Sequence, residues 1–388
     1  MQTDLFDFQT RTRVVFGAGA LEQLGELTRG LPAQRVLLVT DPGLVAAGHA
    51  PRAQRILERA GVRVTVFDRV RENPTTRCVE DCVAVARAAG IEALIGLGGG
   101  SALDTAKGCN FLLTNGGRME DYRGIGRASR PMLPFIAIPT TAGTGSELQS
   151  ATLIADEHTH QKMACLDPKC AARVAVLDPE LTLSQPARVT ACSGLDAIAH
   201  AVESAVTTKR NALSERLSRR AFELCAGAFP VVLREPQNLE ARARMQLGAA
   251  LAGAAIENSM LGAAHAAANP LTAHFDVTHG LAVGLMLPHV VRFNAVEATA
   301  RGIYATLAQA AGLSDGALLP EEALARRLEE WLALTGLPRS LGECGVSRAD
   351  IPMLASEAAR QWTAGFNPRP VGAVDFVTLY TAALGQGG

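Results

Sequence analysis

The chain has 388 residues, of which 48% are apolar and 19% are charged, and its formal net charge is −1. This composition is typical of a globular protein, and the length favours two domains over one compact core. A nearly neutral chain has no strong field to attract nucleic acid or an anionic membrane, so neither is expected as a partner.

Neither a signal peptide nor a membrane span is predicted. The N-terminus carries Asp4 and Asp7 and lacks the basic-then-apolar order of a signal peptide. The longest weakly polar stretch, 247–268, is interrupted by Glu257 and His265, which indicates a buried helix. A cytoplasmic protein is therefore expected.

The eight cysteines form no C-x-x-C pair, so the sequence predicts free thiols and no disulfide framework. We expect these thiols to be buried and to behave as small apolar groups. Cys165 and Cys170 flank a loop and are candidates for exposure, but no chemistry is assigned to them.

The first half of the chain alternates apolar runs with helical patterns. The predicted strands are 35–40, 63–67, 93–97 and 135–138, and helices are expected at 50–60 and 80–89. This alternation predicts a parallel sheet covered by helices on both faces.

The second half is rich in Ala, Leu, Glu and Arg with helical periodicity. Helices are predicted at 190–207, 211–229, 239–257, 259–274 and 318–335. The domain boundary is placed near Ser184–Pro186. The expected fold class is α/β, with an N-terminal parallel-sheet dinucleotide-binding domain (1–186) and an all-helical C-terminal metal-binding domain (187–388).

A glycine-rich turn follows the strand predicted at 93–97 and opens a helix. Its residues are Gly98, Gly99, Gly100 and Ser101, followed by Asp104 and Lys107. Glycines let the backbone approach a phosphate, and the free amides of a helix N-terminus point at its oxygens. The run is not G-x-G-x-x-G, and taken alone it is equally well a tight turn.

A second polar loop, 139–147, follows the strand predicted at 135–138 and contains Thr140, Thr141 and Thr144. Hydroxyls and amides at the carboxyl end of a strand suit a phosphate or an amide of a ligand, although an ordinary loop has the same composition. Asp41 ends the first predicted strand. A carboxylate there can accept hydrogen bonds from ribose hydroxyls and disfavour a 2′-phosphate, or it can cap a turn.

Asp196 and His200 are four residues apart in a predicted helix, so both project from one face and can bind one ion. Glu203 lies one turn further on the same face and is expected to support a ligand. His265 and His279 follow downstream. One carboxylate with imidazoles favours Fe²⁺ or Zn²⁺ over Mg²⁺ or Ca²⁺, but the residues alone do not select ligands among eight histidines.

At this point the sequence resembles the iron-containing (group III) alcohol dehydrogenase family along nearly its whole length. The resemblance is carried by an ordered set of blocks: Gly98–Ser101 with Asp104 and Lys107, Pro139–Glu147, Asp178–Thr182, Gly194–His200, His279-Gly280 with Leu287-Pro288-His289, and Asn367–Pro370. Each block alone is weak, and the ordered set is specific.

The resemblance implies a dinucleotide-binding domain, a helical domain and a metal between them. It implies that four residues bind the metal, namely Asp196, His200, His265 and His279. It implies that the following residues contact NAD(H): Asp41, Gly98, Gly99, Gly100, Ser101, Asp104, Thr140, Thr141, Thr144, Lys162 and Leu181. The histidines at 158, 160, 274 and 289 are assigned no ligand role.

Two positions depart from the family pattern. Asn269 and Asp276 stand where many members have histidine, and the first of these is usually credited with proton handling. Since Asn269 cannot titrate, we expect Asp276, a water chain or the cofactor ribose to pass the proton. Asp276 and His279 are therefore the expected catalytic residues.

The expected activity is reversible conversion of an alcohol and NAD⁺ into an aldehyde or ketone and NADH, with Fe²⁺ favoured and Zn²⁺ as the alternative. Ser150, Leu261, Phe275 and Phe366 suggest an uncharged substrate. A homodimer is expected. The alternatives are a maleylacetate- or hydroxyacid-type reductase, which needs Arg292 or Arg369 at the substrate, a dehydroquinate-synthase-like lyase, and a non-catalytic nucleotide or metal sensor.

Overall fold

The structure is a computed structural model that describes the chain apart from residues 1–5, 7, 158–160, 314–315, 317 and 386–388. The chain divides into two compact units, Gln9–Gln185 and a second unit that begins at Pro186. Two histidines that were assigned no ligand role, His158 and His160, lie outside the described residues, as do Asp4 and Asp7.

The first unit is built on a six-stranded sheet in which every paired neighbour is parallel. In spatial order the strands are β1 (Arg13–Phe16), β9 (Val174–Leu177), β6 (Phe135–Pro139), β4 (Ala93–Gly98), β2 (Arg35–Val39) and β3 (Arg63–Phe67). The central strands are fully buried, because continuous apolar runs suit a sheet covered on both faces.

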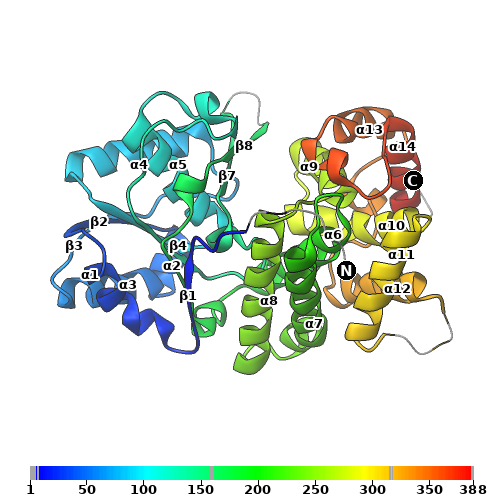
Figure 1. The fold of residues 1–388 in the computed structure, drawn as a ribbon, viewed down its shortest axis with the longest axis horizontal. Helices are drawn as coiled ribbons and strands as arrows, with labels where there is room; N and C mark the ends of the chain where they lie inside the picture. Colours follow the sequence, from blue (N-terminus) through cyan, green and yellow to red (C-terminus); the bar gives the residue numbers. More distant parts are fainter. Residues whose placement is uncertain (1–5, 7, 158–160, 314–315, 317, 386–388) are drawn as a thin grey trace. The chain divides into compact units, whose positions relative to one another are not determined.

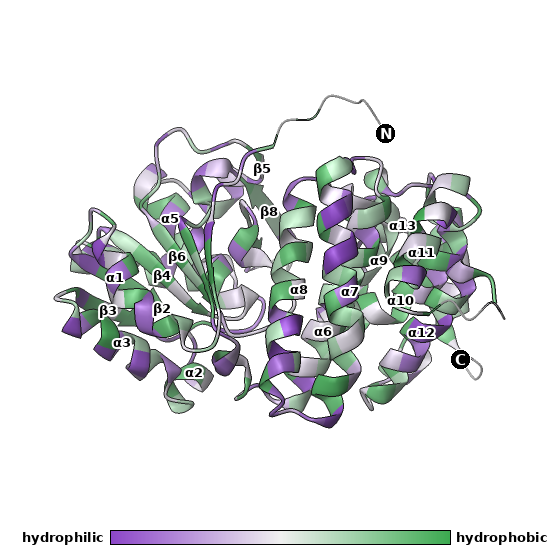
Figure 2. Ribbon diagram, turned by 60° about the horizontal axis from the view of Figure 1, so that its bottom comes forward, coloured by the Kyte–Doolittle hydropathy of each residue, from purple (hydrophilic) through white to green (hydrophobic). Residues whose placement is uncertain are grey.

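Helices cover both faces of this sheet (Figure 1). α1 (Leu24–Arg29) and α3 (His49–Arg59) pack on one face, and α4 (Thr76–Ala89) and α5 (Gly100–Asn115) pack on the other. Alternate side chains of β2 supply the two cores: Val36 and Leu38 face α1 and α3, whereas Leu37 and Val39 face α4 and α5. Figure 2 shows the apolar character of these inner strands.

The unit also contains elements that the sequence patterns did not reveal. β1 and β9 extend the main sheet, and a small sheet has the order β5 (Gly124–Ile125), β8 (Lys162–Leu166), β7 (Ala151–Ala155). The short helix α2 (Pro42–Ala46) follows β2. The 3₁₀ turns are η1 (Ala20–Gln23), η2 (Met119–Tyr122), η3 (Ser146–Leu148), η4 (Pro168–Cys170) and η5 (Pro179–Thr182).

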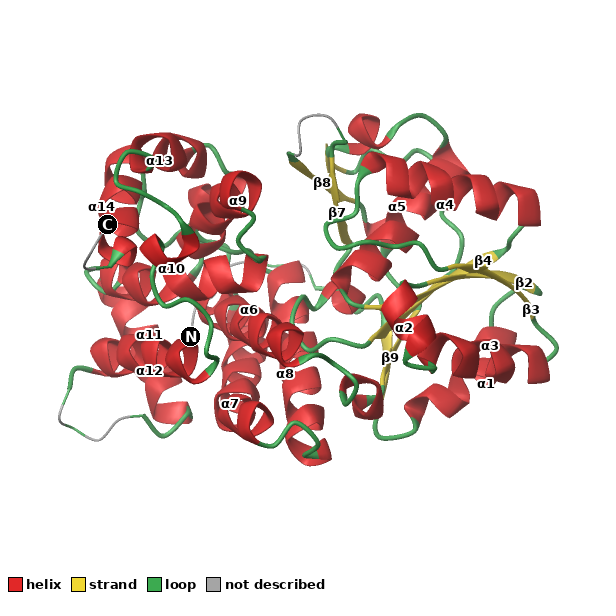
Figure 3. Ribbon diagram, turned by 180° about the vertical axis from the view of Figure 1, so that it is seen from behind, coloured by secondary structure: helices red, strands yellow, loops and turns green. Residues whose placement is uncertain are grey.

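In the part of the second unit that the structure describes, all regular structure is helical (Figure 3). The helices are α6 (Ala187–Val206), α7 (Ala212–Arg234), α8 (Leu239–Glu257), α9 (Ala263–Phe275), α10 (His279–Asn294), α11 (Ala298–Ala310), α12 (Pro320–Leu334), α13 (Ile351–Ala359) and α14 (Ala373–Leu384), with 3₁₀ turns η6 (Gly342–Cys344) and η7 (Trp362–Phe366). α6 is buried almost all round, as expected for an Ala-rich helix at the centre of a bundle.

The cysteines are all free. Six are buried, and these include Cys165 and Cys170, so the suggestion that this pair is exposed was wrong. Both thiols lie in the apolar core between the sheet and α5, and burial raises the pKa of Cys165 to about 12. Among the described residues, the helices are too short or too polar to cross a membrane.

Candidate metal and cofactor sites

The predicted metal ligands of α6 lie on one buried face of that helix. Asp196 and His200 are each 5% exposed, and His200 Nε2 lies 3.4 Å from Asp196 Oδ1. Their separation of four residues places both side chains on the same face. The carboxylate and the imidazole therefore point at one place from a single helix.

Two further helices of the same unit bring the other predicted ligands to this carboxylate. His265, near the start of α9, has its Nε2 3.5 Å from Asp196 Oδ1. His279, the first residue of α10, has its Nε2 3.9 Å from the same oxygen. The rings of His200 and His265 stack with centroids 4.8 Å apart. Three imidazole nitrogens thus surround one carboxylate oxygen.

Two glycines allow the helices to approach closely enough. A Cβ on Gly280 would lie 2.0 Å from the carbonyl oxygen of Cys192 in α6, so the start of α10 needs glycine there. A Cβ on Gly262, just before α9, would lie 3.1 Å from Glu203 Oε1. Small residues at these contacts let His265 and His279 reach Asp196.

The electrostatics of the cluster are those of an anion among imidazoles. Burial opposes the ionised form of Asp196, but the charges of His200 and the neighbouring histidines hold the pKa of this carboxyl well below its usual range. Burial likewise opposes the charged form of His265, but its contacts with Asp196 and Glu203 raise its pKa to about 9. The cluster therefore favours an ionised carboxylate.

The donor set fits a divalent ion. Asp196 Oδ1 and His265 Nε2 are buried without a hydrogen bond, which is costly unless another partner completes them. Asp196, His265 and His279 offer ligand atoms that all lie within 4.8 Å of one another. An ion among these atoms would satisfy the buried oxygen and nitrogen together.

Glu203 contacts His265, one of the predicted ligands, through its side chain. Its Oε2 lies 2.5 Å from His265 Nδ1, and its Oε1 accepts the amide of Ala264 at 2.7 Å. A carboxylate at Nδ1 orients the ring and leaves Nε2 for the ion. Glu203 is itself only 3% exposed, so the imidazole orientation is rigidly defined.

In the first unit, the glycine-rich turn connects β4 to α5 as predicted. Gly98 has φ +156°, and a Cβ there would lie 2.6 Å from the Cβ of Ala102. Gly99 is the N-cap of α5, and α5 begins at Gly100. The amide of Ala102 donates to the carbonyl of Gly99 at 3.0 Å. The amides at the start of a helix lack acceptors one turn back, and the missing side chains of Gly99 and Gly100 let a phosphate approach them.

The second loop packs directly on this turn. A Cβ on Gly99 would lie 3.2 Å from Thr141 Cγ2, and one on Gly100 would lie 2.7 Å from Thr144 Cγ2. The amide of Thr140 donates to the carbonyl of Gly98 at 3.0 Å. The two predicted cofactor loops are therefore one continuous surface at the carboxyl ends of β4 and β6.

Asp41 has one of the two roles that the sequence left open, because it caps a turn, and the ribose contact stays a prediction. Its Oδ1 accepts the amide of Leu44 at 3.0 Å and caps α2. Its Oδ2 points toward Gly98, at 3.5 Å from the place that a Cβ on this glycine would occupy. One oxygen is thus structural, while the other lies beside the glycine-rich turn, where a ribose hydroxyl would donate to it.

Comparison with known proteins gives the family of the chain. Residues 11–179 match the family described as iron-containing alcohol dehydrogenase, and residues 190–384 match the C-terminal domain described as Fe-containing alcohol dehydrogenase family. The chain belongs to the iron-containing alcohol dehydrogenase family. The predicted family and fold class are confirmed, and metal-dependent interconversion of an alcohol and an aldehyde or ketone with NAD(H) is the activity of this family.

Individual relatives cover almost the whole chain. The NAD-dependent methanol dehydrogenase of Bacillus methanolicus is 32% identical over 95% of this chain and 97% of its own length. The lactaldehyde reductase of Escherichia coli (strain K12) is 34% identical over 95% of this chain and 97% of its own length. A crystal structure of a 1,3-propanediol oxidoreductase has a TM-score of 0.94 at 31% identity and covers 98% of this chain and 100% of its own.

The two positions that depart from the family pattern are occupied in different ways. Asn269 lies one turn after His265 in α9, and its Nδ2 donates to Gln361 Oε1 at 3.0 Å. Asp276 is exposed and ends α9 with φ +53°, a left-handed conformation that Asp tolerates. At position 269 the side-chain amides of Asn269 and Gln361 are thus paired, and at position 276 the carboxylate of Asp276 is accessible.

Three predicted cofactor contacts have side chains that are buried or interact with other groups of the protein. The Leu181 side chain is fully buried in the core around α1 and α3, so only its main chain is available to a ligand. Both carboxylate oxygens of Asp104 accept hydrogen bonds from the protein. Lys162 begins β8. Burial raises the pKa of Asp104, and the positive charge of Lys162 lowers this pKa by a smaller amount.

The remaining described histidines have structural partners or surroundings. His274 Nε2 lies 2.9 Å from Glu357 Oε2, and His49 Nε2 lies 2.7 Å from Ser184 Oγ. Burial, together with the charge of Arg292, lowers the pKa of His289. None of the three joins the Asp196 cluster in the described part of the chain.

Some residues near the sites were not identified as functional from the sequence. Asn367 Oδ1 accepts the amide of Ala263 at 3.3 Å, and its Nδ2 donates to Asn294 Oδ1 at 2.7 Å. The Asn367–Pro370 block thus fixes the start of α9, which carries His265.

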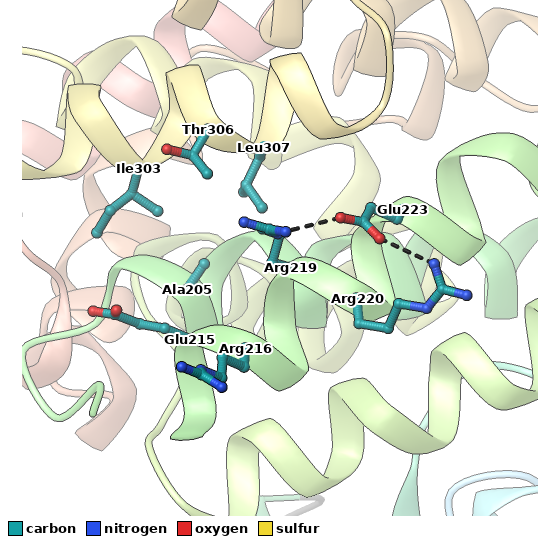
Figure 4. Close-up of a pocket in the computed structure, with 9 residues that line it drawn as sticks. All are labelled: Ala205, Glu215, Arg216, Arg219, Arg220, Glu223, Ile303, Thr306 and Leu307. Atoms are coloured by element: carbon teal, nitrogen blue, oxygen red, sulfur yellow. Dashed lines mark hydrogen bonds and ion pairs between the residues drawn. The ribbon is translucent and has the colours of Figure 1, made fainter. Parts of the chain in front are cut away.

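A cavity of 510 Å³ in the helical unit lies apart from these residues (Figure 4). It is lined by α7 and α11, with Ala205 of α6, and its lining contains none of the predicted ligands. Glu223 pairs with Arg219 at 3.2 Å and with Arg220 at 3.0 Å across its wall. Its charges largely neutralise one another on the solvent side of a helix pair, so we assign it no role.

Proposed function

We propose that this chain is an NAD(H)-linked dehydrogenase of small, uncharged alcohols and the corresponding aldehydes, with one ion bound by Asp196, His200, His265 and His279. The observation that carries this proposal is the convergence of three imidazole nitrogens, at 3.4, 3.5 and 3.9 Å, on one oxygen of Asp196. Oxygen and imidazole donors in this ratio suit Fe²⁺ or Zn²⁺, and membership of the family favours Fe²⁺.

The cofactor is proposed to lie on the surface formed by Gly98–Ser101 and by Thr140, Thr141 and Thr144. The pyrophosphate would take the amides at the start of α5, where the helix dipole also favours an anion. Asp41 Oδ2 favours NAD(H) over NADP(H), because a carboxylate accepts a ribose hydroxyl and repels a 2′-phosphate.

The bound groups supply the reactive chemistry: the ion polarises an alcohol or carbonyl oxygen, and the nicotinamide accepts or donates hydride. The chain's own residues orient the groups that hold the ion, and they exclude water from the site. Glu203 fixes the His265 ring through Nδ1, and the three buried ligands keep water from one side of the site. His279, 27% exposed, marks the open side, and Asp276 is the accessible carboxylate proposed to move the proton.

The positions of two arginines weigh against a reductase of carboxylate substrates. Arg292 is clamped by Glu322 at 2.8 Å and by Glu329 at 2.5 Å. Arg369 stacks on the Phe293 ring and donates to the Phe293 carbonyl at 2.9 Å. Since both guanidinium groups have partners within the helical unit, neither provides a free clamp for a substrate carboxylate.

A homodimer is proposed through the edge strand β1. Val14 and Phe16 on this strand are 43% and 42% exposed, and an edge strand with apolar side chains is a template for pairing with a second copy. Light scattering of the wild-type protein and of Val14→Lys would test this: a wild-type monomer, or a variant that remains fully dimeric, would refute the proposal. A cytoplasmic location stays a prediction.

The decisive experiment for the activity is a screen of NAD⁺ reduction over short alcohols, diols and hydroxy acids, with protein stripped of metal and reloaded with Fe²⁺ or Zn²⁺. The proposal predicts turnover of uncharged alcohols that depends on added metal and exceeds turnover with NADP⁺. NADH binding without turnover of any substrate in the metal-loaded protein would instead indicate a nucleotide sensor.

A further inference from the structure

Lys107 is a fully buried cation whose ammonium group is directed at one segment of the chain. It lies in α5, which begins at the glycine-rich turn, and it is 1% exposed. Its Nζ donates to four acceptors: Ser146 O at 2.7 Å, Ser146 Oγ at 2.9 Å, Gln149 O at 2.9 Å and Ala151 O at 2.8 Å. These acceptors span η3, where the second cofactor loop ends, and the start of β7.

Asp104, one turn earlier in α5, binds the same segment with both carboxylate oxygens. Its Oδ1 accepts Ser146 Oγ at 3.0 Å, and its Oδ2 accepts the amide of Leu153 at 3.2 Å. Its main-chain carbonyl also accepts Thr152 Oγ1 at 2.9 Å. Positions three apart on a helix share a face, so Asp104 and Lys107 hold the segment together from one side of α5.

Ser146 joins this arrangement to a predicted cofactor residue. Its hydroxyl lies between Asp104 and Lys107, and its amide donates to Thr144 Oγ1 at 3.3 Å. Thr144 in turn packs on Gly100, where a Cβ would lie 2.7 Å from its methyl group. A chain of contacts therefore runs from α5 through Ser146 and Thr144 back to the first residue of α5.

The hydrogen bonds of Asp104 and Lys107 also bear on whether these side chains can contact a dinucleotide. A lysine ammonium has three hydrogens, and the four acceptors around Lys107 Nζ use all of them. Asp104 has a protein donor on each carboxylate oxygen. Lys107 therefore has no hydrogen to spare for a dinucleotide unless the loop is dismantled, and both oxygens of Asp104 already accept hydrogen bonds from the same segment.

We propose that Asp104 and Lys107 are positioning residues that fix the second cofactor loop against the glycine-rich turn and so set the affinity for the dinucleotide without touching it. This inference rests on the proposed cofactor site. It changes the role expected for Asp104 from a cofactor contact to a support of the loop. A loop that is already ordered in the free protein binds its ligand more tightly, because the entropy cost of ordering the loop is met when the protein folds.

The test compares three variants with a matched control in the same helix. Lys107→Met removes the donors, Asp104→Asn removes the charge of the acceptor, and Ser146→Ala removes the shared hydroxyl. The control is Asn110→Ala: Asn110 Nδ2 donates to Leu133 O at 2.9 Å and its Oδ1 accepts Leu133 N at 3.0 Å, so it braces α5 elsewhere. The Kd for NADH, the KM for NAD⁺, kcat and Tm are measured for each.

We expect Lys107→Met to raise the Kd for NADH and the KM for NAD⁺ about tenfold or more, because hydrogen bonds from a charged donor to three loop carbonyls are lost. Asp104→Asn and Ser146→Ala are expected to raise both about threefold to tenfold. For all three, kcat at saturating NAD⁺ is expected to stay within about threefold of wild type, since the reacting groups are unchanged. Asn110→Ala is expected to lower Tm with an unchanged Kd.

Ser146→Ala and Asp104→Asn keep the lysine and serve if Lys107→Met does not fold. Unchanged Kd and KM in these two variants, with or without a lower Tm, would overturn the inference while leaving the proposed function intact. A wild-type protein that does not bind NADH would overturn the proposed cofactor site, and the inference with it.

Discussion

A methyl group on Gly280 would lie 2.0 Å from the carbonyl oxygen of Cys192, a distance that no side chain can accept. Gly280 follows the proposed ligand His279 in α10, and Cys192 lies one turn before the proposed ligand Asp196 in α6. The contact between Gly280 and Cys192 therefore sets the separation of two proposed ligands that lie on different helices.

The first prediction is that Gly280→Ala separates α10 from α6 and weakens metal binding about tenfold or more, because His279 moves away from Asp196. Overpacking should also destabilise the protein by about 1–3 kcal/mol. The matched control is Gly302→Ala in α11, where a Cβ meets nothing within 4 Å. Competition with a chelator measures the affinity, and equal metal affinity in the two variants would contradict the account.

The second prediction concerns Glu203, which lies 2.5 Å from His265 Nδ1. Glu203→Gln should lower metal affinity about tenfold to a hundredfold, because the ring loses the charged partner that orients it and makes it a better ligand. Glu223→Gln, which removes only the surface pairs with Arg219 and Arg220, is the control. Metal content after dialysis against a chelator should fall for the first variant and remain that of wild type for the second.

The third prediction is a pH dependence of stability from Glu147, which is 3% exposed. Burial, opposed by a main-chain hydrogen bond and by Lys107, raises its pKa from 4.5 to about 7. The folded state thus holds a proton that the unfolded chain releases, so this contribution is fully present below pH 4.5 and is lost as the pH rises through about 7.

Such a shift corresponds to a loss on the order of 3 kcal/mol in the free energy of unfolding across this range. Glu147→Gln should remove it, so the variant gains stability relative to wild type as the pH rises. Urea unfolding of the metal-free protein at several pH values measures the difference, with Glu240→Gln at the exposed start of α8 as the control. Parallel pH curves for wild type and Glu147→Gln would refute the burial argument.

The fourth prediction concerns proton transfer. Asp276→Asn keeps a residue that tolerates the left-handed conformation at φ +53°, so the end of α9 should be undisturbed. If the carboxylate moves the proton, kcat should fall about tenfold or more and the pH–rate profile should lose one ionisation. An unchanged profile would exclude Asp276 and assign the transfer to water or to the cofactor ribose.

Local patterns in the sequence were sufficient for four of the six strands of the main sheet and for the two proposed metal ligands that lie in one helix. The strands at 35–40 and 93–97 were predicted because continuous apolar runs mark buried parallel strands. Asp196 and His200 were paired because their spacing alone places them on one face of α6.

Features that depend on tertiary contacts were not available from these patterns. β1 and β9 are four residues each and pair across about 160 positions, so neither their existence nor their place in the sheet has a local signal. His265 and His279 reach Asp196 only because α9 and α10 pack on α6, and the residues alone did not select them among the histidines. The role of Lys107 became apparent only with its acceptors 39 to 44 residues away.

The most direct test of the central claim is X-ray absorption spectroscopy of the protein loaded with one equivalent of Fe²⁺. We expect a single ion with three imidazole nitrogens and carboxylate oxygen at about 2.0–2.2 Å, and the loss of one imidazole in His265→Ala. An ion with no imidazole ligands, or a spectrum that His265→Ala leaves unchanged, would contradict the assignment of Asp196, His200, His265 and His279 as its ligands.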